Sequence, residues 1–182
     1  MLFTEVSLKG AYVVDLEKRG DSRGFFGRTY CQREFEEYGL ATQMPQTNVS
    51  FSRNKGTLRG MHYQEAPYEE AKLVRCTRGA IYDVIVDVRP NSSTFKRWFG
   101  VELTEENYRM LYVPEGFAHG FITLSGNTEV NYQVSQFYAP GHERGVRYDD
   151  PSIGIQWPGE VTEISEKDKA WPAFNPSVPE NS

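Results

Sequence analysis

The sequence predicts an all-β fold, organised as a two-sheet jelly roll with short peripheral helices. From residue 57 onward, short runs rich in Val, Ile, Tyr and Phe are each closed by Gly, Pro, Asn or Asp, which is typical of successive β-strands. Hydrophobic residues (38%) and aromatic residues (14%) can fill a core, whereas 16 glycines and 10 prolines interrupt the chain too often for long helices. A sheet without helices to cover its apolar face needs a second sheet, so we expect two packed sheets with a pocket between them.

One expected strand has a clear two-sided pattern. In residues 80–88 the even positions are apolar and the odd positions alternate between Ile and Asp, so we expect one face to pack on a core and the other to carry acids. Residues 25–40 contain the one convincing helical stretch, about two turns that end near Gly39. The expected strands lie near residues 57–64, 72–76, 80–88, 98–103, 108–113, 119–124, 128–138 and 146–148.

The length and charge of the chain restrict its function. A chain of 182 residues predicts one domain that covers residues 1–182. The net charge of −5 disfavours a nucleic-acid binder, so an anionic ligand needs a local basic site. No stretch approaches the ~20 apolar residues of a membrane span, and the first residues do not resemble a signal peptide. Two cysteines, Cys31 and Cys76, are too few for a secreted disulfide framework, so we expect buried free thiols in a cytoplasmic protein that contacts no membrane.

Three histidines, His62, His119 and His142, limit any imidazole chemistry. A jelly-roll metal site needs several imidazoles and a carboxylate, and Gln64 stands two residues after His62, so we expect no metal. His62 and His119 lie in strand-like segments beside glycines, where a backbone can approach a ligand closely. A lone histidine is more often structural, and we keep that interpretation for His142, which lies in a turn.

Cations surround His62 in an otherwise acidic chain. Arg59 precedes it by three residues and Lys72 follows it by ten, which suits an anionic or enolate-forming substrate, although each alone is more typical of a solvated surface. Strict strand alternation would put Arg59 and His62 on opposite faces, so if both face one ligand, Gly60 should carry a bulge or a twist.

Two tyrosines and two aspartates complete the candidates. Tyr132 and Tyr138 are expected on one face of one strand, about 20 Å apart, and a tyrosine opposite a histidine can form a two-base device, although ordinary core tyrosines are the more frequent case. Either Asp83 or Asp168 could orient the imidazole of His62, and the residues alone do not choose between them.

Ordered motifs over nearly the whole chain resemble the dTDP-4-dehydrorhamnose 3,5-epimerases, a family of the cupin class. The resemblance implies a metal-free, cofactor-independent homodimer with a cupin-type jelly roll, which acts on a nucleotide-linked 4-keto-6-deoxy sugar on the way to dTDP-L-rhamnose and cell-surface polysaccharide. The motifs that carry it are DSRGFF (21–26), QTNVS (46–50), TLRGMHYQ (57–64), KLVRC (72–76), GAIYDVIVDVRPNSSTF (79–95), LTEENYRMLYVPEGFAHGF (103–121), VNYQVSQFYAP (130–140), YDDPSIGIQWP (148–158) and ISEKD (164–168).

The resemblance implies roles for individual residues of these motifs. His62 is then the proton-abstracting base, Asp168 its orienting partner, Tyr132 the acid on the other face, and Lys72 the cation that meets the enolate oxygen. The substrate-binding positions are Arg23 and Arg59 for the diphosphate, Tyr138 for stacking on thymine, and Gln46, Asn48, His119 and Glu143 for other ligand contacts.

One position departs from the family pattern. A glutamate often follows the Phe of R-G-x-F-x-E by two residues, and this chain has Arg28 there, which reverses the charge beside the nucleotide site. The alternatives are an epimerase of one carbon or of another nucleoside diphosphate sugar, a metal-dependent cupin, and a sugar-binding jelly roll without turnover.

Overall fold

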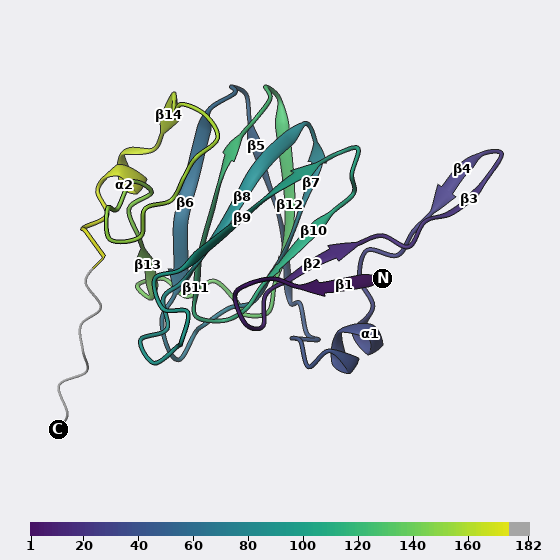
Figure 1. Cartoon of the computed structure of the whole chain (residues 1–182), viewed down its shortest axis with the longest axis horizontal. Helices are drawn as coiled ribbons and strands as arrows, with labels where there is room; N and C mark the ends of the chain where they lie inside the picture. The colour runs from purple at the N-terminus through teal and green to yellow at the C-terminus, as the bar shows by residue number, and fades with distance from the viewer. Residues whose placement is uncertain (175–182) are drawn as a thin grey trace.

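Two facing β-sheets form the body of the protein, as Figure 1 shows. The structure, a computed structural model, describes residues 1–174. Sheet I contains, in spatial order, β1 (Leu2–Glu5), β2 (Tyr12–Asp15), β10 (Met110–Val113), β7 (Lys72–Arg78), β12 (Thr128–Val134) and β5 (Gln46–Ser52). Sheet II contains β13 (Glu143–Gly145), β6 (Thr57–Gln64), β11 (Phe117–Thr123), β8 (Ala80–Asp87) and β9 (Trp98–Thr104), with β14 (Glu163–Ile164) parallel to β6.

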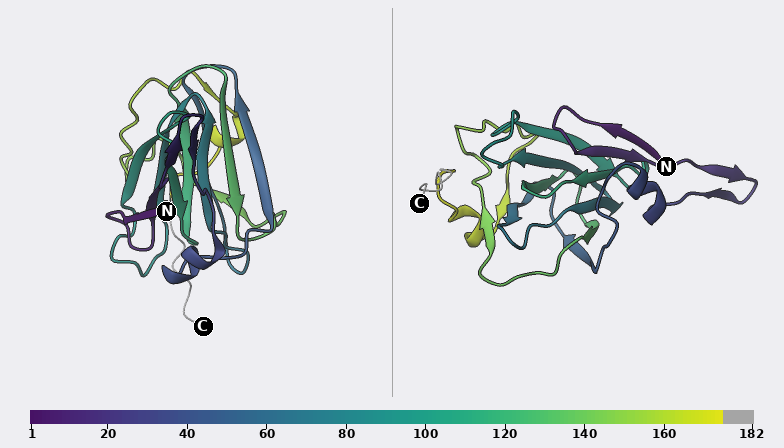
Figure 2. Two further views of the ribbon diagram at one scale, coloured as in Figure 1. Left: turned by 90° about the vertical axis from the view of Figure 1, so that its right-hand side faces the viewer. Right: turned by 90° about the horizontal axis from the view of Figure 1, so that it is seen from below.

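Smaller elements lie outside the two sheets. The hairpin of β3 (Arg19–Asp21) and β4 (Gly24–Phe26) extends away from the body at one end, as both Figure 1 and Figure 2 show. The helices are α1 (Gln32–Glu37), near the base of the hairpin, and α2 (Glu166–Lys169), beside β6 and β14. None of the helices in the described part of the chain has the length and hydrophobicity to span a membrane.

The predicted jelly roll is confirmed, and most strand positions agree with the sequence. Two of the expected strand positions were wrong. The strand expected over 128–138 ends at Val134, because the next backbone N–H groups bond to the Ala71 carbonyl and to glutamine side chains instead of a neighbouring strand. Residues 146–148, which were expected to form a strand, follow the end of β13. The chain turns there, and the Asp150 N–H donates to the Arg147 carbonyl.

The predicted helix is shorter than expected. It covers Gln32–Glu37, and β4 occupies the beginning of the range in which it was expected. Gly39 follows it with a φ of 67°, a left-handed conformation that ends a helix and that glycine adopts without strain. The helix buries Phe35 against the outer face of sheet I.

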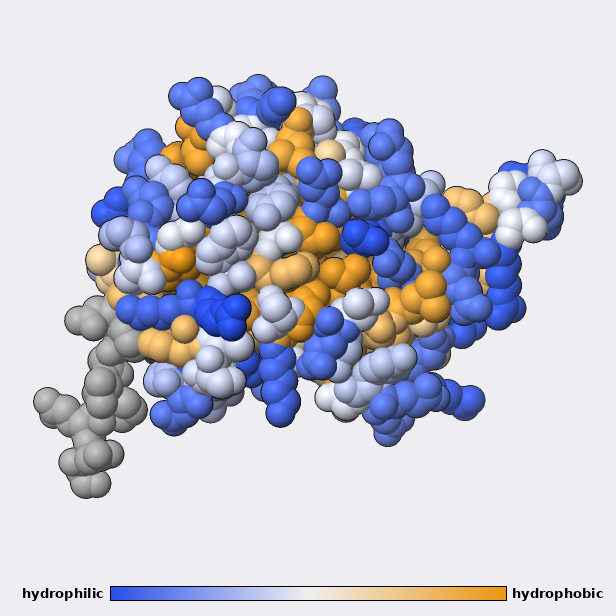
Figure 3. All heavy atoms as spheres, viewed as in Figure 1, coloured by the Kyte–Doolittle hydropathy of each residue, from blue (hydrophilic) through white to orange (hydrophobic). Residues whose placement is uncertain are grey.

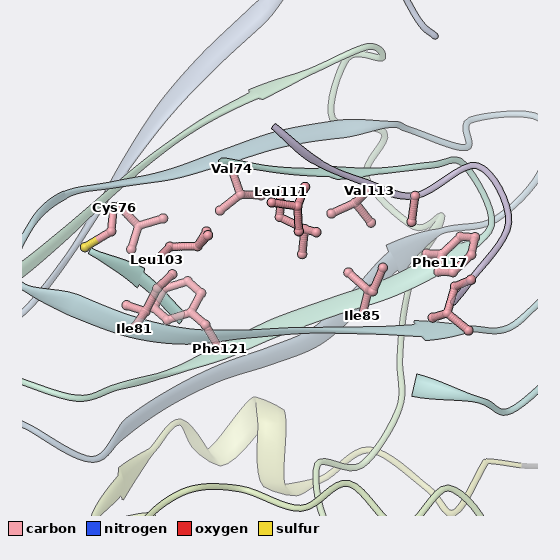
Figure 4. Packing of buried hydrophobic residues seen from close by; sticks show 13 residues of the cluster. Val74, Cys76, Ile81, Ile85, Leu103, Leu111, Val113, Phe117 and Phe121 are labelled. Carbon is pink, nitrogen blue, oxygen red and sulfur yellow. The ribbon is translucent and has the colours of Figure 1, made fainter. Parts of the chain in front are cut away.

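Both faces of β8 are buried, which corrects the expectation of one apolar and one acidic face. Ile81 and Ile85 point between the sheets into the main core, shown in Figure 4. Val84 and Val86 point outward and are covered by a second cluster that includes residues from segment 146–157. The two acids of this strand, Asp83 and Asp87, are fully buried beside the isoleucines, where each has hydrogen-bond partners.

The two thiols differ in their surroundings. Both are free, as expected. Cys76 is buried in the main core, and loss of solvation there raises its pKa to about 11. Cys31, at the start of α1, is half-buried, which corrects the expectation that both are buried.

Asp87 holds the loop between β8 and β9. Its carboxylate accepts hydrogen bonds from Arg89 at 2.7 and 2.9 Å, from Ser92 at 2.5 Å and from Thr94 at 2.6 Å. Burial by itself raises the pKa of Asp87, but these hydrogen bonds outweigh it and bring the pKa below its ordinary value of 3.8.

We predict that Asp87→Asn lowers the free energy of unfolding at pH 7 by about 2–3 kcal/mol, because charge-assisted hydrogen bonds to a buried carboxylate are lost. The difference should be constant above the unfolded pKa of 3.8 and shrink as the pH falls through the lower folded pKa, since the wild-type carboxylate then protonates. Urea unfolding at several pH values measures it.

The control is Asp149→Asn, which removes a similar bidentate pair with Arg147 on the surface. It should change the free energy of unfolding by about 0.5 kcal/mol or less. Equal losses in the two variants would contradict the structural role of Asp87.

Candidate active site

Two adjoining cavities lie between the sheets along β6. The first, of about 450 Å³, is lined by β6, β11 and the segment that contains β14 and α2. The second, of about 270 Å³, is lined by β5, β6 and the loop that follows β12. His62, Lys72 and Tyr132 line both cavities, so these three side chains lie where the cavities meet.

An irregularity in β6 turns both Arg59 and His62 toward the first cavity. His62 pairs with His119 of β11, and Arg59 pairs with Phe121, so three steps on β6 match two steps on β11. The extra residue lies at Gly60, whose φ of 115° is strained for any residue with a side chain. The predicted bulge or twist at Gly60 is therefore confirmed.

The glycines beside the two histidines allow close strand packing, and Gly120 also lines the first cavity. A Cβ on Gly60 would lie 2.6 Å from the Gly120 Cα, and a Cβ on Gly120 would lie 2.6 Å from the Arg59 carbonyl oxygen. The backbones of β6 and β11 can approach this closely because both positions lack a side chain.

His62 is paired with Asp168, whereas Asp83 contacts the other buried histidine. The His62 Nε2 lies 2.6 Å from Asp168 Oδ1, and the His119 Nε2 lies 2.7 Å from Asp83 Oδ1. Asp168 belongs to α2, where the Ser165 hydroxyl caps the helix by accepting from the Asp168 N–H.

The environment of Asp168 determines the tautomer of His62. Burial raises the pKa of Asp168, but hydrogen bonds with His62, the Gly60 N–H and Ser165 outweigh it, and the net pKa is below the ordinary value of 3.8. An ionised carboxylate only accepts hydrogen bonds, so the His62 Nε2 carries the proton and donates it to Asp168. The lone pair of the neutral imidazole is then on Nδ1, which makes Nδ1 the basic atom.

Lys72 and Tyr132 reach the same cavities from sheet I. The Lys72 ammonium lies 3.1 Å from the Glu70 carboxylate, and both side chains are largely buried. Burial is the largest cause that raises the pKa of the Tyr132 phenol, and the negative charge of Glu70 raises it further. The phenol therefore stays protonated at neutral pH and can serve as a proton donor.

Arg59 differs from the other cations of the cavities. Its guanidinium donates to the Ser52 hydroxyl at 3.1 Å and to the Phe51 carbonyl at 2.9 Å. Lys167 contacts Glu143, and Lys72 contacts Glu70. Within residues 1–174, Arg59 forms no salt bridge with a carboxylate, so its charge is available to an anionic ligand.

Three of the polar residues expected to bind substrate, Gln46, Asn48 and Glu143, line the second cavity, and Tyr138 reaches it from a loop. Tyr138 is 58% exposed, and its backbone N–H donates to the Gln46 side chain. The strand geometry that predicted a 20 Å separation from Tyr132 does not apply, because β12 has already ended. The second cavity brings together Gln46, Asn48, Tyr138 and Glu143 with His62, Lys72 and Tyr132.

Three other residues named by the sequence lie outside these cavities. Arg23 is at the tip of the β3–β4 hairpin, where it is 86% exposed and pairs with Asp21. Arg28, the departure from the family pattern, pairs with Glu34 of α1 at 3.2 Å. His142 lies in a turn against the Tyr68 ring, in agreement with a structural role.

Sequence reasoning missed three residues of the site. Glu70 stands two residues before Lys72, a spacing that puts side chains on one face of an extended chain. Lys167 stands beside Asp168 and lines the first cavity with Ser50, a polar inward-facing residue of β5. In the described part of the chain, no cluster of three His, Cys, Asp or Glu side chains is arranged to hold a metal ion.

The chain is similar to known proteins over nearly its whole length. A family model described as dTDP-4-dehydrorhamnose 3,5-epimerase matches residues 5–176. The enzyme of that name from Methanothermobacter thermautotrophicus is 46% identical over 173 residues, which cover 93% of this chain and 92% of that protein. The crystal structure of dTDP-4-dehydrorhamnose 3,5-epimerase from Elizabethkingia anophelis matches with a TM-score of 0.93 at 40% identity and covers 96% of both chains.

A relative with a different specificity also matches. The crystal structure of a 3′-monoepimerase from Streptomyces bikiniensis, in complex with dTDP-quinovose, has a TM-score of 0.84 at 34% identity and covers 92% of this chain and 85% of that chain. Since the family model spans nearly the whole sequence and the relatives align over nearly their whole lengths, this chain belongs to the dTDP-4-dehydrorhamnose 3,5-epimerase family.

Proposed function

We propose that this protein epimerises dTDP-4-dehydro-6-deoxy-D-glucose at C3 and C5 and so produces dTDP-4-dehydro-L-rhamnose. The observation that carries the proposal is the placement of acid and base groups across one cavity. The His62–Asp168 pair comes from sheet II and α2, and Tyr132 and Lys72 come from sheet I. An epimerase needs this division, because a proton must leave one face of a carbon and return to the other.

The reaction can be written with these four side chains. The neutral imidazole of His62 takes the proton from C3, and the electron pair of the broken C–H bond forms a C3–C4 double bond. The C4 ketone oxygen becomes an enolate, which the Lys72 ammonium stabilises. The Tyr132 phenol then gives a proton to the opposite face of C3, and the ketone re-forms. Water returns a proton to Tyr132 and receives one from His62, and the same steps through C4–C5 invert C5.

The substrate would span both cavities. Arg59, which has two neutral acceptors and no carboxylate, would bind the diphosphate through its guanidinium. Gln46, Asn48 and Glu143 would contact the nucleoside or sugar hydroxyls in the second cavity, and Tyr138 would stack on thymine. His119, held by Asp83 in the first cavity, would donate to the sugar or to the diphosphate.

A second candidate is epimerisation of one carbon only. The structural likeness to the 3′-monoepimerase favours it, since the same fold supports both outcomes. The difference depends on whether the sugar presents C5 as well as C3 to His62, which the product distinguishes.

The proposal includes a homodimer in which the hairpin of one subunit serves the cavity of the other. Arg23 is exposed at the hairpin tip, where it lines neither cavity of its own chain. The outer face of β5 exposes Val49 (62%) and Phe51 (42%), and β4 exposes Phe26 (67%), so apolar surface is available for a second copy. Figure 3 shows apolar residues at the base of the hairpin and polar residues at its tip.

The proposal also includes a cytoplasmic location and a role in rhamnose supply for cell-surface polysaccharide. The free thiols Cys31 and Cys76 support the location, because cytoplasmic proteins keep such thiols reduced. The product would be a 4-keto sugar nucleotide, so a reductase of the C4 ketone must consume it.

We predict that the wild-type protein in deuterated water incorporates deuterium at both C3 and C5 of dTDP-4-dehydro-6-deoxy-D-glucose. His62→Ala should slow this exchange by about 10²–10⁴-fold, because the base is removed. Proton NMR of the sugar measures both positions. Exchange at C3 alone would establish the mono-epimerase instead, and full exchange in the variant would exclude His62 as the base.

Tyr132→Phe separates proton removal from proton return. The base remains, so exchange at C3 with retention of configuration should continue, whereas formation of the inverted product should slow by about 10²–10⁴-fold. The measurement compares deuterium incorporation with product formation in the same NMR sample. Equal slowing of both would contradict the assignment of Tyr132 as the acid.

The dimer predicts a solution mass of twice the chain mass of 20.9 kDa in light scattering. Arg23→Ala and His62→Ala should each be inactive or strongly impaired alone. An equal mixture, exchanged to equilibrium, should recover about a quarter of the wild-type activity, since half of the dimers are mixed and each has one intact site. A monomer, or a mixture without recovery, would remove the shared-site proposal.

A further inference from the structure

The segment that carries Asp168 has little regular structure of its own. β14 has two residues and α2 has four, and a helix this short is not stable without tertiary contacts. The Ser165 cap and the Lys167–Glu143 contact hold part of it. The distance between Asp168 and His62 therefore depends on how the end of this segment is fixed to the barrel.

Trp171 follows α2 by two residues and packs beside the ring of His62. The centroids of the two rings are 6.4 Å apart at an interplanar angle of 67°, an edge-to-face contact. The indole also lies over Gly145 of β13, and Gly145 is the register partner of His62. One side chain thus contacts the imidazole and anchors the segment that carries its carboxylate partner.

Gly145 provides the space that the indole occupies. A Cβ on Gly145 would lie 2.0–2.3 Å from three atoms of the Trp171 ring system, a distance that real contacts do not reach. The φ of Gly145 is outside the left-handed region, so its backbone suits alanine as well as glycine. Alanine at this position would therefore displace the indole without straining the backbone.

We propose that Trp171, seated on Gly145, is a positioning residue that holds His62 and Asp168 in register for proton transfer. The inference rests on the proposed function and adds residues to it that touch no substrate. Trp171 lines the groove of about 440 Å³ on the other side of β6, with Tyr63, Arg144 and Phe174, and it lines neither substrate cavity.

The indole acts through its shape in this proposal. Its Nε1 is buried and has no hydrogen-bond partner within residues 1–174. Trp171→Phe keeps an aromatic ring on Gly145 and loses no hydrogen bond, so it should retain activity close to that of the wild type. Trp171→Ala removes the contact.

The experiment compares Trp171→Ala, Gly145→Ala, the double variant and Trp171→Phe in the full-length protein. We expect each alanine variant to lower kcat about 10–100-fold, since a displacement of about 1 Å between base and substrate costs this much. The dissociation constant for dTDP, measured by calorimetry, should change by less than about twofold, because the nucleotide cavity is not touched. Thermal unfolding establishes that each variant is folded.

The double variant separates positioning from general destabilisation. If Gly145 serves only to seat the indole, Gly145→Ala has no further effect once Trp171 is alanine, so the losses do not multiply. Multiplied losses, or a Trp171→Ala variant with wild-type kcat, would overturn the proposal.

Trp157→Ala is the matched control. Trp157 packs in the layer outside sheet II, and its indole donates to the Tyr148 carbonyl at 2.9 Å. Its loss should lower the unfolding temperature and leave kcat within about twofold of the wild type, since a stability change away from the site does not alter chemistry in the folded fraction. An equal kcat loss in this variant would contradict a specific role for Trp171.

A substrate-free measurement keeps this inference distinct from the proposed function. The ¹⁵N NMR shifts of the His62 ring report its hydrogen bond to Asp168, with His62→Ala used for assignment. These ¹⁵N shifts should differ from the wild-type values in Trp171→Ala and Gly145→Ala and should equal them in Trp171→Phe and Trp157→Ala. Absence of turnover in the wild type would remove the proposed function, and unmoved shifts in Trp171→Ala would remove the positioning role.

Discussion

The close contact between β6 and β11 at Gly60 is the constraint on which the rest of the site depends. Regular alternation along β6 would point either Arg59 or His62 away from the cavity, and the extra residue at Gly60 lets both line it. The Gly60 N–H also donates to Asp168 at 3.4 Å. One local irregularity thus sets the positions of His62 and Arg59 and contributes a donor to the Asp168 carboxylate that pairs with His62.

The strands that cross the core were predictable because their residues follow the period of two. β8 places Ile81 and Ile85 on the core face by this alternation, whereas β6 departs from it at Gly60, and the bulge there follows from requiring Arg59 and His62 on one face. β5 was not predictable from this pattern, because its polar residues face inward and its apolar residues face outward. Its inward residues Gln46, Asn48 and Ser50 line cavities, and its apolar residues Val49 and Phe51 face outward. A strand that lines cavities with polar side chains on one face and exposes apolar side chains on the other has no hydrophobic alternation toward the core.

The motifs named most of the side chains in the site, and the family resemblance implied the His62–Asp168 pair, but the residue pattern alone could not supply the pairings between distant segments. His62 and Asp168 are 106 residues apart, and Asp83 was an equal candidate because it alternates with core residues on a strand. The choice follows from topology, since β14 runs beside β6 and brings α2 to His62, whereas β8 lies beside β11 and brings Asp83 to His119. Trp171 and Gly145 had no sequence signal for the same reason, because their contact exists only after the segment has folded back.

Charge balance inside the cavities bears on how an acidic protein could hold the doubly charged diphosphate of the proposed substrate. A buried charge is costly unless it is paired, and the Lys72 ammonium lies 3.1 Å from the Glu70 carboxylate of the same chain. This pairing reduces the attraction that Lys72 offers to an anionic ligand. Arg59 is solvent-exposed and donates to two neutral acceptors. Water can therefore solvate its guanidinium charge, and an anionic ligand can replace that water. The proposed shared site agrees with this balance, because one arginine neutralises only part of a diphosphate, and Arg23 is an exposed guanidinium that a second copy of the chain could offer.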